Sequence, residues 1–311
     1  MSQKLALVFP GQGSQTVGML ADLYAEYEVV RDTFAESSAA LGYDLWQLVA
    51  NGPEADLNET HRTQPALLTA SVAIWRLWQQ QGGATPDYLA GHSLGEYSAL
   101  VCAGVLSLGD AVSLVEKRGQ YMQTAVPAGT GAMSAIIGLD DALIAKACDE
   151  AAQGEVVSPV NFNSPGQVVI AGNKAAVERA NELCKAAGAK RALPLPVSVP
   201  SHCALMKPAA AQLATDLASM SFNVPTFAVV NNVDVAIAAD ETAVKDALVR
   251  QLYSPVRWTE TIEWLSAQGV TQVVEIGAGK VLNGLVKRIN RDLEVSSVND
   301  LASFKAAFAA E

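Results

Sequence analysis

The stretch that decides the fold is DYLAGHSLGEYSALVCAGVL, residues 87–106. A short apolar, strand-like run leads to Gly91, and a helix-like run begins at Gly95. Between them Ser93 has the spacing G-x-S-x-G, which is typical of a nucleophile presented on a sharp strand-to-helix turn. A serine that only caps the helix is the alternative. The strand, the turn and the helix together favour a nucleophile at Ser93.

The regions on either side of this turn predict an α/β fold. Apolar runs at residues 4–10, 226–232 and 270–277 are typical of strands, and amphipathic helical stretches separate them. Strands that alternate with helices in this way predict a parallel sheet covered by helices. With a nucleophile at the end of one strand, we expect the larger part of the chain to be hydrolase-like.

The middle of the chain follows a different order. After the loop PAGTG at residues 127–131, strand-like and helical runs succeed one another as βαββαβ, up to the proline-rich segment at residues 194–200. This order is the ferredoxin-like pattern. We therefore predict a small ferredoxin-like subdomain at residues 128–197, inserted into a large subdomain made of residues 1–127 and 198–311.

Composition and charge narrow the class of protein. The 311 residues are 50% hydrophobic and 17% charged, which suits a globular protein with a sizeable core. The net charge of −11 argues against binding to nucleic acid, which needs a basic face. No apolar run is long enough to span a membrane, and the apolar residues 5–9 are too few for a signal peptide. We expect a cytoplasmic protein.

Neither the cysteines nor the glycine-rich loops indicate a metal or a cofactor. The cysteines, at positions 102, 148, 184 and 203, lack metal-ligand spacing, and we expect reduced, buried thiols. GQGSQ at residues 11–15 lacks the third glycine of a dinucleotide-binding loop, and GAGK at residues 277–280 lacks the hydroxyl residue of a P-loop. Because the first loop follows a strand, its backbone amides are candidates for an oxyanion hole.

Three histidines are candidates for the base that a serine nucleophile needs. His61 lies in a polar segment that we interpret as a surface loop, and His92 adjoins the serine, where the side chains of a tight turn diverge. His202 lies where a strand-like segment meets a helix and is the better candidate, with a purely structural histidine as the alternative. No acid between Ser93 and His202 stands out, so we predict a Ser–His dyad completed by a backbone or amide acceptor.

Arg118 lies on the apolar face of a predicted helix. It follows Ala111, Leu114 and Val115 at helical spacing, so it points inward with them. A buried guanidinium must be paired, because an unpaired buried charge is costly. Its partner is either a carboxylate of the protein or a carboxylate of the ligand, and the sequence leaves both open.

The motifs around these residues point to one family. The chain resembles, from end to end, the malonyl-CoA:acyl carrier protein transacylases of bacterial type II fatty acid synthesis. The resemblance is carried by FPGQGSQ, GHSLGEYSAL, VEKRGQYM, PVNFNSPGQVVIAG, PLPVSVPSH and RQLYSPVRW. Together these motifs are far more specific than any one of them.

The resemblance implies roles for the residues that react or bind. It implies that Ser93 is the nucleophile, that His202 is the general base, and that Arg118 binds the malonyl carboxylate. It also implies that the backbone amides of Gln12 and Leu94 form the oxyanion hole.

Two further residues enter through the resemblance alone. Gln251 is implied to orient His202 through its main-chain carbonyl, which would supply the acceptor that the dyad needs. Asn163 is implied to line the site.

The activity that the resemblance implies is transfer of a malonyl group from malonyl-CoA to the phosphopantetheine thiol of acyl carrier protein, in two steps through a malonyl-serine. Coenzyme A and phosphopantetheine belong to the substrate and the partner, so we expect no cofactor in the chain itself, and we expect a monomer. The alternatives are a thioesterase or esterase that passes the acyl group to water, and a non-catalytic subunit that docks acyl carrier protein.

Overall fold

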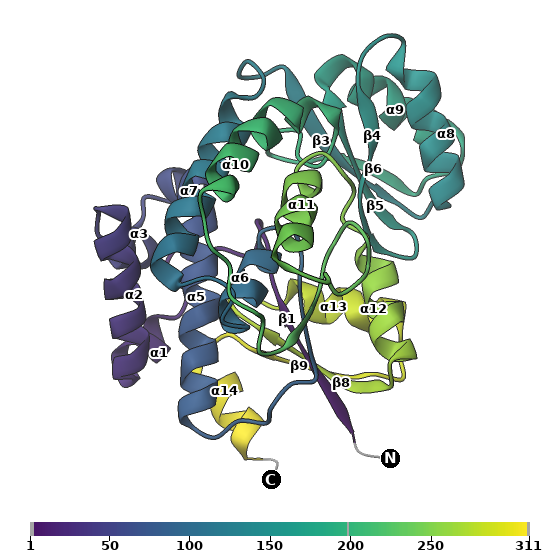
Figure 1. Cartoon of the computed structure of the whole chain (residues 1–311). Helices are drawn as coiled ribbons and strands as arrows, with labels where there is room; N and C mark the ends of the chain where they lie inside the picture. The colour runs from purple at the N-terminus through teal and green to yellow at the C-terminus, as the bar shows by residue number, and fades with distance from the viewer. Residues whose placement is uncertain (1–2, 198, 310–311) are drawn as a thin grey trace.

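The computed structural model describes residues 3–197 and 199–309, and it has two unequal parts, each built on its own sheet (Figure 1). The larger sheet has five strands, and each adjacent pair is parallel. In their order across the sheet, these strands are β7 (Ala228–Val230), β2 (Tyr88–Gly91), β1 (Lys4–Phe9), β8 (Val270–Ile276) and β9 (Glu294–Val298). The predicted parallel sheet is confirmed.

The smaller sheet has four antiparallel strands. In their order across the sheet, these are β4 (Val157–Ser164), β5 (Gln167–Asn173), β3 (Gly131–Ile137) and β6 (Arg191–Pro194). Two helices, α8 (Asp141–Ala152) and α9 (Lys174–Ala186), complete the chain order β3-α8-β4-β5-α9-β6. The predicted βαββαβ pattern is confirmed, and its strands lie between residues 131 and 194.

Helices make up most of the larger part. Before the small sheet come α1 (Ala21–Glu26), α2 (Glu28–Leu41), α3 (Leu45–Asn51), α4 (Glu54–Leu57), α5 (Thr60–Gln80), α6 (Gly95–Cys102) and α7 (Leu108–Thr124). After it come the 3-10 turn η1 (Ala204–Met206), α10 (Lys207–Ala218), α11 (Glu241–Gln251), α12 (Trp258–Ala267), α13 (Val281–Ile289) and α14 (Leu301–Phe308).

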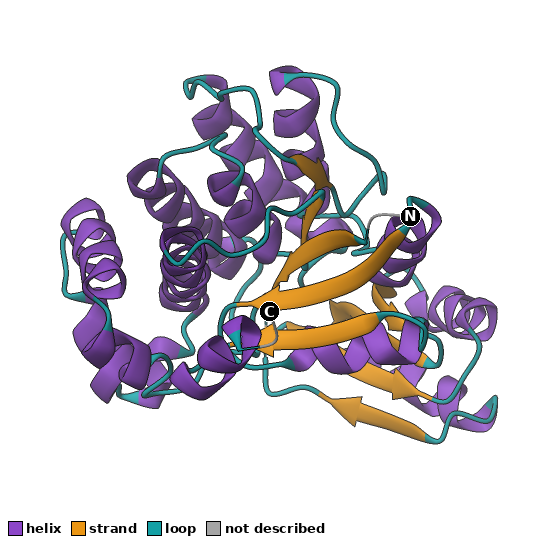
Figure 2. Cartoon of the chain, turned by 90° about the horizontal axis from the view of Figure 1, so that it is seen from below, coloured by secondary structure: helices purple, strands orange, loops and turns teal. Residues whose placement is uncertain are grey.

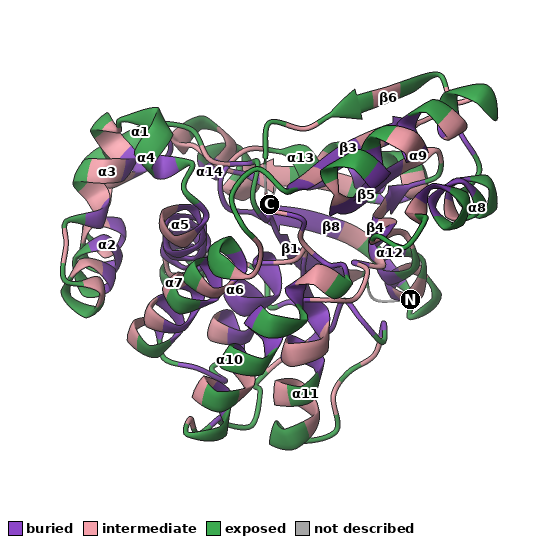
Figure 3. Cartoon of the chain, turned by 90° about the horizontal axis from the view of Figure 1, so that it is seen from above, coloured by how far each residue is buried: buried purple, intermediate pink, exposed green. Residues whose placement is uncertain are grey.

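The larger sheet is buried on both faces. Successive residues of a strand point to opposite sides, so each strand contributes to two cores. Leu5, Leu7 and Phe9 of β1 pack into the core that includes α5, α6 and α7, whereas Ala6 and Val8 pack into the core that includes α12 and α13. Figure 2 shows helices on both sides of the strands. In Figure 3, most of β8 is buried, while α8, α10 and α11 turn exposed faces to solvent.

The small sheet also uses both of its faces. One face packs on α8 and α9 through Ile136, Val168 and Ile170. The other face includes Met133 and Val169, which pack in one cluster with Cys203, the neighbour of His202. The small sheet therefore forms a wall beside the predicted base.

Two details differ from the sequence analysis. The chain forms a fifth parallel strand, β9, at the edge of the larger sheet, where we predicted none. Its side chains are mostly exposed or half-buried, so it lacks the apolar run by which the other strands were found. His61, expected in a loop, belongs to the first turn of α5, where its Nδ1 lies 3.1 Å from Gln123 Oε1.

No helix within the described ranges combines the length and the apolar character that crossing a membrane requires. The four cysteines are free and buried, as expected.

Candidate active site

Ser93 occupies a strained turn between β2 and α6. Its φ of 53° lies in the left-handed region, which is costly for a residue other than glycine and is found at active sites. The glycines on either side make the turn possible. A Cβ at Gly91 would lie 1.9 Å from the backbone of Gly95, and a Cβ at Gly95 would lie 2.1 Å from the carbonyl oxygen of Phe9. The G-x-S-x-G spacing is thus required by close backbone approach.

His202 is placed as a base for Ser93. The Ser93 Oγ lies 2.7 Å from His202 Nε2, and His202 Nδ1 lies 2.7 Å from the main-chain oxygen of Gln251. Because a carbonyl oxygen only accepts, Nδ1 carries the proton, and Nε2 is free to accept from the serine hydroxyl. A main-chain carbonyl therefore takes the place of the acid of a triad.

The surroundings of His202 keep its ring neutral. The side chain is buried, and this burial, together with the positive charge of Arg118, lowers the pKa of His202 to about 3. A neutral imidazole is the form that can take a proton from the serine. Cys203, next in sequence, is no rival as nucleophile, since burial raises the pKa of its thiol to about 11.

Arg118 of α7 is fully buried and points at Ser93. Its Nη2 lies 3.5 Å from Ser93 Oγ and donates to Gln251 Oε1 at 2.9 Å, and its Nη1 donates to Gln64 Oε1 at 2.7 Å. Both close acceptors are neutral amides. Among the described residues, no carboxylate forms an ion pair with Arg118, and its Nε has no hydrogen-bond partner. The sequence left two partners open for Arg118, a carboxylate of the protein and a carboxylate of the ligand. The described residues do not provide the first.

The loop after β1 packs directly against the turn of residues 91–95 that presents Ser93, which we call the elbow. A Cβ on Gly11 would lie 2.5 Å from the carbonyl oxygen of His92, so the loop and the turn are in contact. Within the described chain, the amides of Gln12 and Leu94 donate to no backbone acceptor. Free amides beside a nucleophile are what an oxyanion hole needs. Their assignment to that role stays a prediction.

No group of three or more histidine, cysteine, aspartate or glutamate side chains in residues 3–197 and 199–309 is arranged to hold a metal ion.

Comparisons with known proteins agree along the whole chain. The acyl transferase domain family matches residues 6–304. The malonyl CoA-acyl carrier protein transacylase of Salmonella typhimurium is 68% identical over 304 residues, which cover 98% of each chain. The protein of the same name from Bacillus subtilis is 46% identical over 305 residues, which cover 98% of this chain and 96% of the relative. The chain belongs to the malonyl-CoA:acyl carrier protein transacylase family.

Solved structures of other transacylases share this fold. An acyl carrier protein S-malonyltransferase from Vibrio cholerae superposes with a TM-score of 0.96 at 70% identity, covering 98% of this chain and 99% of the other. A malonyl-transacylase in complex with its type II PKS acyl-carrier protein superposes with a TM-score of 0.98 at 64% identity, covering 99% of this chain and 100% of the other. The two-part architecture is therefore that of the transacylase family.

His92 serves this transacylase in a different way from His202. Its Nε2 lies 2.7 Å from Asn163 Oδ1 of β4, and its ring centroid lies 5.5 Å from that of Trp258. The ring thus points from the elbow toward β4 of the small sheet. Among the described residues, Asn163, assigned to the site by resemblance alone, is linked to Ser93 through this neighbour.

Three side chains of the site were missed by the sequence analysis. They are Gln64, Glu96 and Asn232, and all three are buried. Gln64 holds Arg118, and Asn232 accepts from the backbone amide of Ser93 at 2.8 Å. The available signal was polarity in otherwise apolar surroundings. Gln64 interrupts the buried run of α5, and Asn232 follows the strand β7.

Proposed function

We propose that the chain transfers the malonyl group of malonyl-CoA to the phosphopantetheine thiol of acyl carrier protein through a malonyl ester of Ser93. The observation that carries this proposal is Arg118, a buried cation beside Ser93 Oγ with neutral amides as its close protein partners. An acyl group that ends in a carboxylate would supply the missing counter-charge through a charge-assisted hydrogen bond. The names of the relatives, which include an acyl carrier protein complex, support the same donor and acceptor.

The first half-reaction begins with attack of Ser93 Oγ on the thioester carbonyl. His202 Nε2 takes the hydroxyl proton, and the negative charge that develops on the carbonyl oxygen is held by the amides of Gln12 and Leu94. The tetrahedral intermediate collapses, the carbon–sulfur bond breaks, and the imidazolium returns the proton to the departing coenzyme A sulfur. The product is a malonyl ester on Ser93.

The second half-reaction repeats these steps in reverse. The phosphopantetheine thiol gives its proton to His202 Nε2 and attacks the ester carbonyl. The carbon–oxygen bond to Ser93 then breaks, and the proton passes back to the serine oxygen. Charges and protons balance within the dyad, so we further propose that the enzyme needs no cofactor of its own. Ser93, His202, Arg118 and Gln251 meet within one chain, so we also propose that the enzyme acts as a monomer.

Intact-protein mass spectrometry after brief mixing with malonyl-CoA tests this function. We expect a gain of one malonyl group that is absent in Ser93→Ala and is discharged onto added acyl carrier protein. An adduct that decays to free malonate at the same rate with or without carrier would make the chain a hydrolase. No adduct on the wild type, together with tight binding of the carrier, would make it a docking subunit.

A further inference from the structure

Glu96 is a buried carboxyl group directly beneath the site, and the mechanism above does not use it. It lies in the first turn of α6, three residues after Ser93, and is only 2% exposed. One of its oxygens, Oε2, accepts from the backbone amide of Asn232 at 3.0 Å and from Gln251 Nε2 at 2.9 Å. Burying a carboxyl group is costly unless the group is hydrogen-bonded or paired.

The contacts of Gln251 give its side-chain amide a direction. Its Oε1 accepts from Arg118, while its Nε2 faces Glu96 Oε2 and the carbonyl oxygen of Ser93, the latter at 3.0 Å. An ionised carboxylate can only accept, and a guanidinium can only donate. Only one orientation of the amide satisfies both neighbours. A glutamine placed between two donors, or between two acceptors, would have no such preference.

Asn232 extends the same network to the nucleophile. With its backbone held by Glu96, its side chain accepts from the backbone amide of Ser93 at 2.8 Å and donates to the carbonyl oxygen of Gly91 at 2.6 Å. These two contacts span the left-handed turn that presents the serine. The position of Glu96 is therefore linked to the strained backbone of the elbow.

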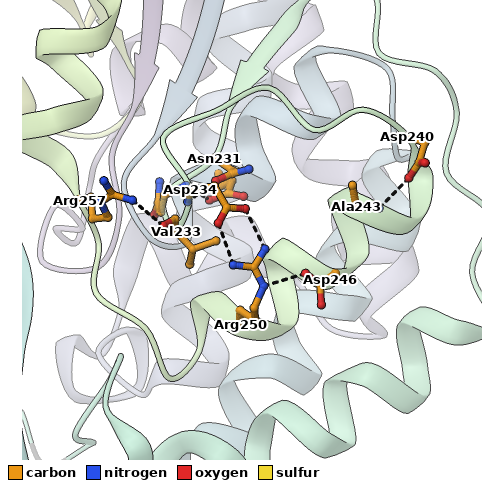
Figure 4. A network of polar contacts seen from close by, with 10 residues as sticks. Asn231, Val233, Asp234, Asp240, Ala243, Asp246, Arg250 and Arg257 are labelled. Atoms are coloured by element: carbon orange, nitrogen blue, oxygen red, sulfur yellow. Dashed lines mark hydrogen bonds and ion pairs between the residues drawn. The ribbon is translucent and has the colours of Figure 1, made fainter.

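An outer ion pair holds the two segments that meet Glu96. Arg250, next to Gln251, binds both carboxylate oxygens of Asp234 at 2.9 and 2.8 Å and also contacts Asp246 (Figure 4). Asp234 lies two residues after Asn232. The end of α11 and the loop after β7 are thus clamped together at the surface, which leaves Glu96 to set hydrogen-bond direction inside.

We propose that Glu96 is a positioning residue for the transfer reaction. By accepting from Gln251 and Asn232 together, its carboxylate fixes the direction of the amide that holds Arg118 and the turn that holds Ser93. This inference rests on the proposed roles of Arg118 and Ser93. It assigns Glu96 no contact with the acyl group, so its loss acts through Arg118 and the elbow.

Glu96→Gln tests the proposal, because it keeps the size of the side chain and removes the charge of the acceptor. A neutral amide oxygen accepts more weakly than a carboxylate from Gln251 Nε2 and from the Asn232 amide, so the Gln251 oxygen that holds Arg118 is less firmly placed. We expect kcat/KM for malonyl-CoA to fall about tenfold more than kcat/KM for acetyl-CoA, the scale of one hydrogen bond to a charged group. A residue that only stabilises the fold would lower both equally, and an unchanged malonyl-to-acetyl ratio would overturn the proposal.

Glu275→Gln is a matched control. Glu275 of β8 is also fully buried and accepts from two backbone amides, those of Leu282 and Asn283, and burial raises the pKa of each of the two glutamates to about 7. Its contacts lie at the start of α13 and include no residue of the site. We expect Glu275→Gln to lose stability and to keep the malonyl-to-acetyl ratio of the wild type.

The pH dependence of the malonyl-to-acetyl ratio in the wild type offers a second test. Near pH 7, Glu96 gains a proton and is no longer only an acceptor, so the malonyl-to-acetyl ratio should fall as the pH falls from 8 to 6. Among its charged neighbours, Arg118 lowers the pKa of Glu96 and Asp234 raises it. His202, with its pKa lowered to about 3, and Tyr97, with its pKa raised to about 12, keep their charge throughout. This fall of the malonyl-to-acetyl ratio with pH should persist in Glu275→Gln and vanish in Glu96→Gln.

Failure of this inference is distinguishable from failure of the proposed function. If the wild type forms no malonyl-Ser93, the function itself is wrong. If the wild type forms it, while the ratio is flat with pH and unchanged in Glu96→Gln, only the role of Glu96 is wrong.

Discussion

The two sheets contribute to the site very unequally. Loops and helices at the carboxyl edge of the parallel sheet supply Ser93 after β2, Gln12 after β1 and Asn232 after β7. Among the described residues, the antiparallel sheet makes one polar contact to the elbow, between Asn163 and His92. Parallel strands end together at one edge, so the residues that follow them converge there. Strands of an antiparallel sheet end alternately at both edges, which suits a wall better than a reaction centre.

The strongest test of the difference between the two sheets uses two glycines with the same steric conflict. A Cβ at Gly91, beneath the nucleophile, would lie 1.9 Å from the backbone of Gly95, and a Cβ at Gly172, in β5, would lie 1.9 Å from the carbonyl oxygen of Val156. Each alanine variant should lose more than about 4 kcal/mol of stability, since backbone atoms must move. Chemical denaturation measures this loss.

The two variants should differ in activity per folded molecule. Folded Gly172→Ala should still gain a malonyl group in the mass measurement, whereas Gly91→Ala should not, because the displaced backbone carries Ser93. Gly154→Ala is the control, with a positive φ and open space around the new methyl group. It should cost only about 1–2 kcal/mol. Equal acylation by the Gly91 and Gly172 variants would refute the division between the sheets.

The next effect belongs to Arg118, for which we propose the choice of acyl group. Arg118→Ala should lower malonyl transfer about ten- to a hundredfold, the worth of a charge-assisted hydrogen bond of about 1.5–3 kcal/mol. Acetyl transfer should be kept or raised, because an acetyl group has no carboxylate to bind. Steady-state kinetics with both thioesters checks this, and equal losses for the two would remove Arg118 from substrate binding.

The same variant changes the pH dependence in a defined direction. After burial, the charge of Arg118 is a further cause that lowers the pKa of His202. Without that charge the protonated ring is less unfavourable, so the pKa rises toward its ordinary value. Acetyl transfer by Arg118→Ala should therefore be lost at a higher pH, on acidification, than acetyl transfer by the wild type. A measured acid limb at the same pH in both proteins would contradict this electrostatic link.

The sequence predicted the parts of this site that leave a local pattern. Glycines around Ser93 and the helical spacing that turns Arg118 inward are visible within a few residues, and the order βαββαβ follows from a succession of such local patterns. The partners that hold these groups are not local. Glu96 and Asn232 are 136 positions apart, and Arg118 and Gln251 are 133 positions apart. Only the fold brings such pairs together, so no spacing rule could have found them.

The edge strand β9 was missed for a related reason. Its sequence, EVSSV, has little apolar character, and it is recognised by its pairing with β8. Pairing between strands depends on residues that are distant in sequence, as do the contacts of Glu96 and Arg118.

The smallest effect is expected where the antiparallel sheet touches the elbow. Asn163→Ala removes one neutral hydrogen bond to His92 Nε2, worth about 0.5–1.5 kcal/mol, so malonyl transfer should fall about twofold to tenfold. Asn163→Asp keeps an acceptor at that position and should recover part of the loss. The malonyl-to-acetyl ratio should not change in either variant, because His92 does not contact Arg118 in the network described above. A loss as large and as selective as that of Arg118→Ala would mean that the small sheet takes part in recognition of the acyl group, and the distinction between a reaction centre and its wall would no longer hold.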